Sequence, residues 1–144
     1  GSLEGGPDFN NDIAWRHPNN GYPYGQCTWF AAGRLYEIYG IYDSRLGDGD
    51  EWVGNLVRYH PDVFDFSLSP KPGAIFSAQS HPHVGLVVAV NGNKITVQEG
   101  NLNQTTDSWE VAIEDWQEMT YTFEEFERNY GQVQYANPIN SPVQ

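Results

Sequence analysis

Residues 24–34 read Tyr-Gly-Gln-Cys-Thr-Trp-Phe-Ala-Ala-Gly-Arg and open the most regular element that the sequence predicts. Apolar residues recur at helical spacing from here to Gly40, a residue type that commonly ends helices, so we expect a helix over residues 27–39. Cys27, the only cysteine of the chain, stands in its first turn. Free backbone N–H groups and the positive end of the helix dipole favour a thiolate there. The position is typical of a nucleophile, although most lone cysteines are simply small buried residues.

Beyond this helix the pattern changes from helices to strands. A second short helix is expected between Asp50, as its N-cap, and Pro61. Thr122 and Glu125 have the spacing of a capping box that opens a later helix. Strands are expected at residues 74–76, 83–90, 94–99, 111–113 and 133–135. Helices followed by mostly sequential strands indicate an α+β fold with an antiparallel sheet, because a parallel sheet would require alternating βαβ units.

The longest predicted hairpin brings three polar residues to its open end. His83 begins its first strand, while Glu99 and Asn101 end the second. A three-residue loop at residues 91–93 would place His83 opposite Asn101 and diagonal to Glu99, with all three on one face. A two-residue loop would instead move Glu99 to the other face, and a bulge would alter the count again. We expect the three-residue loop.

These residues together could hydrolyse an amide. A Cys27 thiolate needs a base that removes its proton and later returns it to the leaving amine, which suits His83. Glu99 or Asn101 would orient the imidazole ring. The backbone N–H of Cys27 and the side chain of Gln26 could bind the developing oxyanion. The simpler alternative is that His83 is a solvated residue at a strand end.

Four segments of the chain, taken together, resemble the CHAP domain, the cysteine, histidine-dependent amidohydrolase/peptidase family. The segments are residues 24–34, Pro72-Gly73-Ala74-Ile75, His83-Val84-Gly85-Leu86-Val87 and Glu99-Gly100-Asn101, in the family's order. The resemblance implies a papain-like α+β fold, in which N-terminal helices carry the nucleophile and pack against an antiparallel sheet of about five or six strands. It also implies that the family's catalytic positions fall on Cys27, His83, Glu99 and Asn101.

The resemblance further implies a peptidoglycan hydrolase without a cofactor. Such domains cut either the amide between N-acetylmuramic acid and L-alanine or an amide of the stem peptide or cross-bridge. They occur in phage lysins, secreted autolysins and conjugation-associated hydrolases, so we expect an extracellular, cell-wall location. Two alternatives stay open: a catalytically silent wall-binding or scaffolding module, and an amidase acting on a small conjugate such as glutathionylspermidine.

Net charge restricts the partners of this chain. Seven basic residues against nineteen acidic ones give a net charge of −12, which disfavours nucleic acids and anionic membranes. An acidic module is also poorly attracted to an anionic cell wall, so we expect targeting by another domain or a partner protein. The sequence contains no apolar run long enough to predict membrane insertion.

Aromatic and acidic residues supply the remaining candidates. Tyr24, directly before the nucleophile, and Trp29 are candidates for contact with substrate, although large aromatic residues more often fill cores. Some phage members bind calcium just before the nucleophile, but residues 17–24 lack carboxylates here, and we predict no metal site. The acidic loop 43–51 could hold a cation or simply cap a helix. A zinc site at His81-Pro82-His83 lacks two further ligands.

The length of 144 residues fits one domain. We expect residues 1–12 to be a flexible segment that begins with a cloning scar, residues 13–137 to be the catalytic domain, and residues 138–144 to be a tail. We also expect the chain to be excised from a larger protein.

Overall fold

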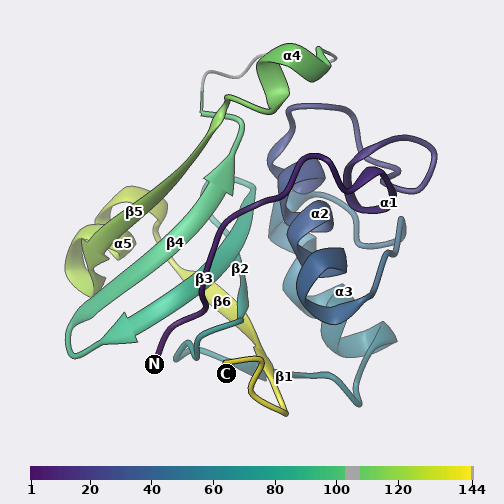
Figure 1. The fold of residues 1–144 in the computed structure, drawn as a ribbon. Helices are drawn as coiled ribbons and strands as arrows, with labels where there is room; N and C mark the ends of the chain where they lie inside the picture. Colours follow the sequence, from purple (N-terminus) through teal and green to yellow (C-terminus); the bar gives the residue numbers. More distant parts are fainter. Residues whose placement is uncertain (103–107, 144) are drawn as a thin grey trace.

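The computed structural model describes residues 1–102 and 108–143 and confirms the α+β class. The helices are α1 (Asp12–Trp15), α2 (Cys27–Tyr39), α3 (Trp52–Tyr59), α4 (Trp109–Ala112) and α5 (Phe123–Tyr130), with a 3-10 turn, η1 (Gly49–Glu51), before α3. The strands are β1 (Phe64–Ser67), β2 (Ile75–Ala78), β3 (His83–Asn91), β4 (Lys94–Gly100), β5 (Trp116–Thr122) and β6 (Val133–Pro138). All neighbouring strands are antiparallel, in the order β1-β6-β2-β3-β4-β5 (Figure 1).

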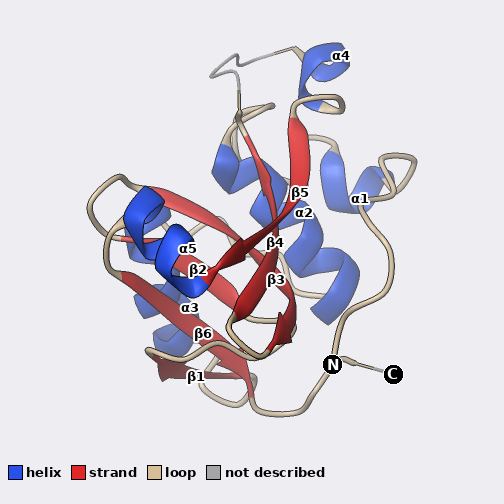
Figure 2. Cartoon of the chain, turned by 90° about the vertical axis from the view of Figure 1, so that its left-hand side faces the viewer, coloured by secondary structure: helices blue, strands red, loops and turns tan. Residues whose placement is uncertain are grey.

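Helices cover the sheet on both faces. α2 and α3 lie against one face, and α5 lies on the other (Figures 1 and 2). Each face buries its own apolar cluster, and alternate residues of the strands supply the two sides. The cluster beneath α2 and α3 includes Leu35, Leu56, Ile75, Leu86 and Ala136. The cluster beneath α5 includes Phe76, Val87, Val97 and Phe126. The result is a three-layer molecule in which α2 and α5 approach the central strands from opposite sides.

The predicted bounds of α2 are confirmed. The helix runs from Cys27 to Tyr39, and Gly40 ends it in the left-handed conformation, with φ of 71°. Gly33 in its middle is required by close packing, because a Cβ there would lie 2.2 Å from the ring of Trp15. The second predicted helix is also present, but its first turn is η1. The N-cap of η1 is Asp48, which forms a capping box with Glu51, rather than the predicted Asp50.

The predicted three-residue loop of the hairpin is wrong. Asn91 pairs with Lys94, so residues 92–93 form a two-residue turn, with Gly92 at φ of 60°. Gly92 favours a two-residue turn here, because glycine readily adopts the positive φ that such turns require. By itself this turn would shift the register of the hairpin by one residue.

A β-bulge in β3 reverses that shift. The register changes between Val87 and Ala89. On the His83 side of this bulge, Val87 pairs with Val97 and Leu86 pairs with Gln98. The extra residue restores the pairing that the three-residue loop would have given. His83, the first residue of β3, and Glu99, the penultimate residue of β4, therefore lie on the same face of the sheet, as predicted.

Three other regions differ from the expected pattern. Residues 111–113, expected as a strand, belong to or follow helix α4, whose N-cap Ser108 accepts a hydrogen bond from the backbone of Val111. The edge strands β1 and β5 were not predicted. The N-terminal segment lies along the sheet, where the backbone N–H of Leu3 donates to the carbonyl of Val88 at 2.7 Å, and its flexibility stays a prediction. Among the described residues, no helix is long and apolar enough to cross a membrane.

Candidate active site

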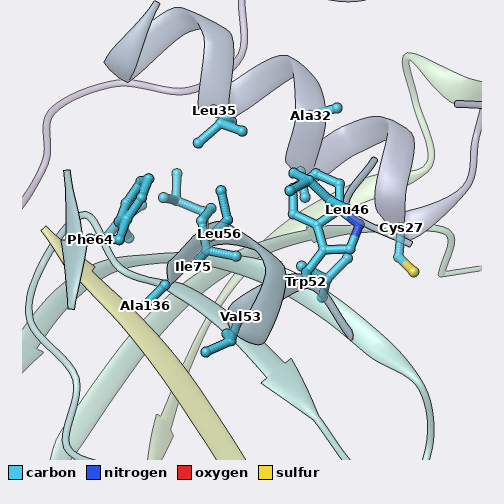
Figure 3. Close-up of a cluster of buried hydrophobic side chains, with 14 residues drawn as sticks. Cys27, Ala32, Leu35, Leu46, Trp52, Val53, Leu56, Phe64, Ile75 and Ala136 are labelled. Atoms are coloured by element: carbon cyan, nitrogen blue, oxygen red, sulfur yellow. The ribbon is translucent and has the colours of Figure 1, made fainter. Parts of the chain in front are cut away.

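Cys27 occupies the first turn of α2, where the helix meets the end of the sheet. Its side chain is 9% exposed and lies at the edge of an apolar cluster, beyond Leu46 and Trp52 (Figure 3). The preceding residue, Gln26, is the N-cap of α2. Its backbone is in an extended conformation, and its side chain makes no capping hydrogen bond. The first backbone N–H groups of a helix have no acceptor within the helix. Free donors therefore surround the sulfur on the helix side.

His83 and Glu99 form the polar contact that faces Cys27. Nε2 of His83 lies 2.7 Å from Oε1 of Glu99, whose side chain is fully buried. The Cys27 sulfur is close enough to the ring to contribute to its raised pKa. Because the carboxylate occupies Nε2, Nδ1 is the ring nitrogen left for the thiol.

The pKa of His83 is raised to about 9. Burial of the ring lowers this pKa, but hydrogen bonds to Cys27 and Glu99 and the negative charges of both groups outweigh the loss of solvation. At neutral pH the ring is thus protonated. It can stabilise a negative charge on the sulfur and can later donate a proton.

Glu99 is held by three donors. Besides His83, the Tyr130 hydroxyl donates to Oε1 at 2.5 Å and the Gln117 amide donates to Oε2 at 3.3 Å. Burial alone would raise the pKa of Glu99, but the hydrogen bonds from His83, Tyr130 and Gln117, together with the charge of His83, hold it below its usual value. This residue is therefore a carboxylate despite its burial. Gln117 and Tyr130 were not identified from the sequence, because β5 was not predicted and the helix after Thr122 was predicted without a link to Glu99.

Asn101 follows β4 but takes no part in the contact with His83. It is in the left-handed conformation, with φ of 62°, and its backbone N–H donates to the carbonyl of Asp115. The oxygen of its side-chain amide is buried and has no hydrogen-bond partner among the described residues. Of the two residues expected to orient the ring, Glu99 makes the contact.

The two aromatic candidates have different surroundings. Tyr24 is half-buried, stacks on the ring of His17 with centroids 4.1 Å apart, and meets Trp109 edge-on at 5.4 Å. Trp29 is 1% exposed, and its indole N–H donates to the carbonyl of Trp15 at 2.9 Å. The Trp29 side chain therefore belongs to the core, and this burial does not favour the predicted substrate contact. A substrate contact at Tyr24 stays a prediction.

The acidic loop 43–51 divides into two parts. The buried Asp43 accepts hydrogen bonds from Arg45 and lies 2.8 Å from Nε2 of His60. Asp48, Asp50 and Glu51 can bring one carboxylate oxygen each within 4.8 Å of one another. Glu51, however, is engaged in the capping box of η1. The capping box thus accounts for Asp48 and Glu51, and a cation at this turn stays an open alternative.

The fold and the site together define a papain-like α+β protein, in which a cysteine at a helix start meets a histidine from an antiparallel sheet. The model of the CHAP domain family matches residues 17–101, which include Cys27, His83 and Glu99. The chain belongs to this family.

Similar proteins come from staphylococci. The chain is 35% identical over 99 residues to "Probable autolysin LDP" of Staphylococcus aureus, covering 65% of this chain and 33% of that protein. It is 30% identical over 94 residues to "Probable autolysin SsaALP" of the same organism, covering 63% of this chain and 34% of that protein. The crystal structure of an N-acetylmuramoyl-L-alanine amidase from S. aureus superimposes with a TM-score of 0.57 at 21% identity, over 79% of this chain and 30% of that one. The chain thus spans about a third of the length of these curated relatives.

Proposed function

We propose that this domain is a peptidoglycan hydrolase that cleaves an amide bond with Cys27 as the nucleophile. The observation that carries the proposal is the position of His83, whose Nε2 lies 2.7 Å from the Glu99 carboxylate and whose pKa is raised by interactions with both the Cys27 sulfur and Glu99. Membership of the CHAP domain family and similarity to two probable autolysins support the substrate class.

The chemistry follows from the proton on His83. The Cys27 sulfur attacks the amide carbonyl, and the resulting oxyanion accepts hydrogen bonds from the Cys27 backbone N–H and the Gln26 side chain. The imidazolium of His83 then donates its proton to the leaving amine, which breaks the C–N bond and leaves a thioester on Cys27. Neutral His83 then deprotonates a water molecule, which attacks the thioester. The C–S bond breaks, the acyl group leaves as a carboxylic acid, and the free Cys27 sulfur and protonated His83 are restored. Glu99 maintains the orientation of the ring throughout.

Lysis of purified cell walls tests the nucleophile. We expect the wild-type domain to clear a peptidoglycan suspension and Cys27→Ala to lose this activity, since no other thiol is present. His83→Ala should behave like Cys27→Ala, whereas His81→Ala, two residues away and exposed, should retain activity. Equal clearing by the wild type and Cys27→Ala would contradict the proposal. Wall binding without clearing by any variant would favour a catalytically silent wall-binding module.

Two amide bonds are consistent with this site. Mass spectrometry of the released fragments distinguishes them, because cleavage next to the sugar frees the lactyl carboxyl group of muramic acid, whereas cleavage within the peptide creates new peptide termini. Hydrolysis of glutathionylspermidine in place of either bond would identify the small-conjugate alternative.

The site of action follows from the substrate. We propose that the domain acts outside the cell at the wall. With a net charge of −12, it has little electrostatic attraction to an anionic wall, so a further domain or a partner protein would direct it there.

A further inference from the structure

Tyr130, at the end of α5, makes two contacts with the candidate catalytic residues. Its hydroxyl donates to Oε1 of Glu99 at 2.5 Å, the same oxygen that lies 2.7 Å from Nε2 of His83. Its ring stacks on the imidazole, with centroids 5.3 Å apart and planes 6° from parallel. One side chain thus contacts both the carboxylate and the ring that the carboxylate orients.

The helix that carries Tyr130 is firmly held. The capping box of Thr122 and Glu125 closes its first turn. Phe126 in its middle is fully buried and packs edge-on against Phe76, at 5.2 Å between centroids. Because both the start and the middle of α5 are anchored, the position of the Tyr130 hydroxyl is fixed by the fold.

The environment of Glu99 keeps this hydroxyl a donor. Burial, followed by the negative charge of Glu99, raises the pKa of Tyr130 far above its ordinary value. The other groups that face Glu99 are His83 from β3, Gln117 and Tyr121 from β5, and the Cys27 sulfur of α2 through His83. Burial and Glu99 likewise raise the pKa of Tyr121. His83 is therefore the one positive group among them, and Tyr130 and Gln117 supply neutral donors.

We propose that Tyr130 is a positioning residue of this site, whose hydroxyl keeps the Glu99 carboxylate directed at His83 while its ring fixes the plane of the imidazole. This inference rests on the proposed function, which makes Cys27 and His83 the reacting pair. Tyr130 does not touch the reacting atoms and acts through Glu99 and His83.

Tyr130→Phe tests the inference, because it removes the hydroxyl and keeps the ring. The matched control is Tyr39→Phe. Tyr39 lies at the end of α2 that is far from Cys27, and its hydroxyl also donates a 2.5 Å hydrogen bond, in this case to the carbonyl of Gly73. Two readouts require no substrate. Carbon-13 NMR of the Glu99 carboxyl group gives its pKa, and the rate of iodoacetamide alkylation at neutral pH follows the reactivity of Cys27, the only thiol.

We expect Tyr130→Phe to raise the pKa of Glu99, because one of the hydrogen bonds that lower it is lost. The rate of Cys27 alkylation at neutral pH should then fall, because a less firmly oriented His83 stabilises a negative charge on the sulfur less well. With peptidoglycan, kcat should fall on the order of 10- to 100-fold while KM is kept. Tyr39→Phe should match the wild type in all three measurements.

An unchanged pKa of Glu99 and an unchanged alkylation rate of Cys27 in folded Tyr130→Phe would overturn the inference. If this variant does not fold, NMR titration of Glu99 in the wild-type domain is the test. A Glu99 pKa at or above the ordinary carboxyl value would show that its donors do not hold it ionised, and it would overturn the inference. A failure of the proposed function is distinguishable from a failure of this inference. If the wild-type domain does not cleave peptidoglycan, the proposed function is wrong, and the NMR and alkylation measurements still test the role of Tyr130.

Discussion

Gly49 and His83 touch through their backbones, since a Cβ built on Gly49 would lie 2.6 Å from the backbone nitrogen of His83. The 3-10 turn η1 therefore braces the start of β3, where the strand presents His83 to Cys27. The contact has no room for a methyl group, and the atoms that it would meet are backbone atoms, which cannot rotate away. The turn η1, which resembles an ordinary helix start, thus helps to position the imidazole of His83.

Gly49→Ala should disturb this placement. We expect a loss of about 1–3 kcal/mol in the free energy of unfolding, the usual cost of overpacking, together with a large loss of activity. Urea denaturation and the wall-clearing assay measure the two effects.

Gly54→Ala is the control for that substitution. A Cβ at Gly54, on the exposed side of α3, meets no atom within 4 Å. Replacing glycine by alanine inside a helix should stabilise the protein by about 0.5–1 kcal/mol and leave activity unchanged. If both variants behave alike, the contact between η1 and β3 does not position His83.

Glu99→Gln should shift the alkaline limb of the pH–activity profile. The hydrogen bond and charge of Glu99 help to raise the pKa of His83 to about 9. Without that charge the imidazole loses its proton at lower pH, so activity should begin to decline about 1–3 pH units earlier. NMR titration of the His83 ring provides an independent measurement. An alkaline limb that stays in place would show that the carboxylate does not control the protonation of His83.

Asp43→Asn should destabilise the protein in a pH-dependent way. The hydrogen bond from the Arg45 side chain, followed by smaller contributions that include His60, holds the pKa of Asp43 well below its usual range. A carboxyl whose pKa is lower in the folded than in the unfolded state stabilises the fold above the unfolded value of about 4, and this contribution is lost as pH falls. The gap in Tm between wild type and variant should therefore be full above about pH 5 and narrow below about pH 4.

Asp62→Asn provides the comparison for Asp43, because Asp62 is exposed. Its Tm should follow the wild type across the whole pH range. A gap between wild type and Asp43→Asn that does not depend on pH would show that lost packing, rather than lost charge, causes the change.

The sequence was sufficient to predict α2 because local rules determine it. Helical spacing and Gly40 define its extent, and both bounds agree with the structure. The hairpin shows where local rules fail. The turn at residues 92–93 and the bulge in β3 each shift the register by one residue in opposite senses, so the predicted face of Glu99 is correct although the predicted loop is wrong. A bulge depends on packing against neighbouring strands, which the sequence of one hairpin does not specify.

The donors around Glu99 could not be predicted for a related reason. Gln117 and Tyr130 lie 18 and 31 residues beyond Glu99. They reach it because β5 pairs with β4 and because α5 then folds over the sheet face that carries Glu99. Trp29 presents the converse case. Its proximity in sequence to Cys27 suggested a role at the site, but alternate sides of a helix face different surroundings, and Trp29 faces the core.

The part of the chain that defines the family and the part that completes the site do not coincide. Residues 17–101 include the thiol, the imidazole and the carboxylate, whereas Gln117 and Tyr130 follow that segment. Two relatives could therefore share every signature residue and still differ in how strongly their carboxylate is held. Transplanting the signature segment into another scaffold would move the candidate catalytic groups without the hydroxyl and amide that accompany them here. Whether a given relative is active should accordingly be judged on its last strand-and-helix pair as well as on its motif.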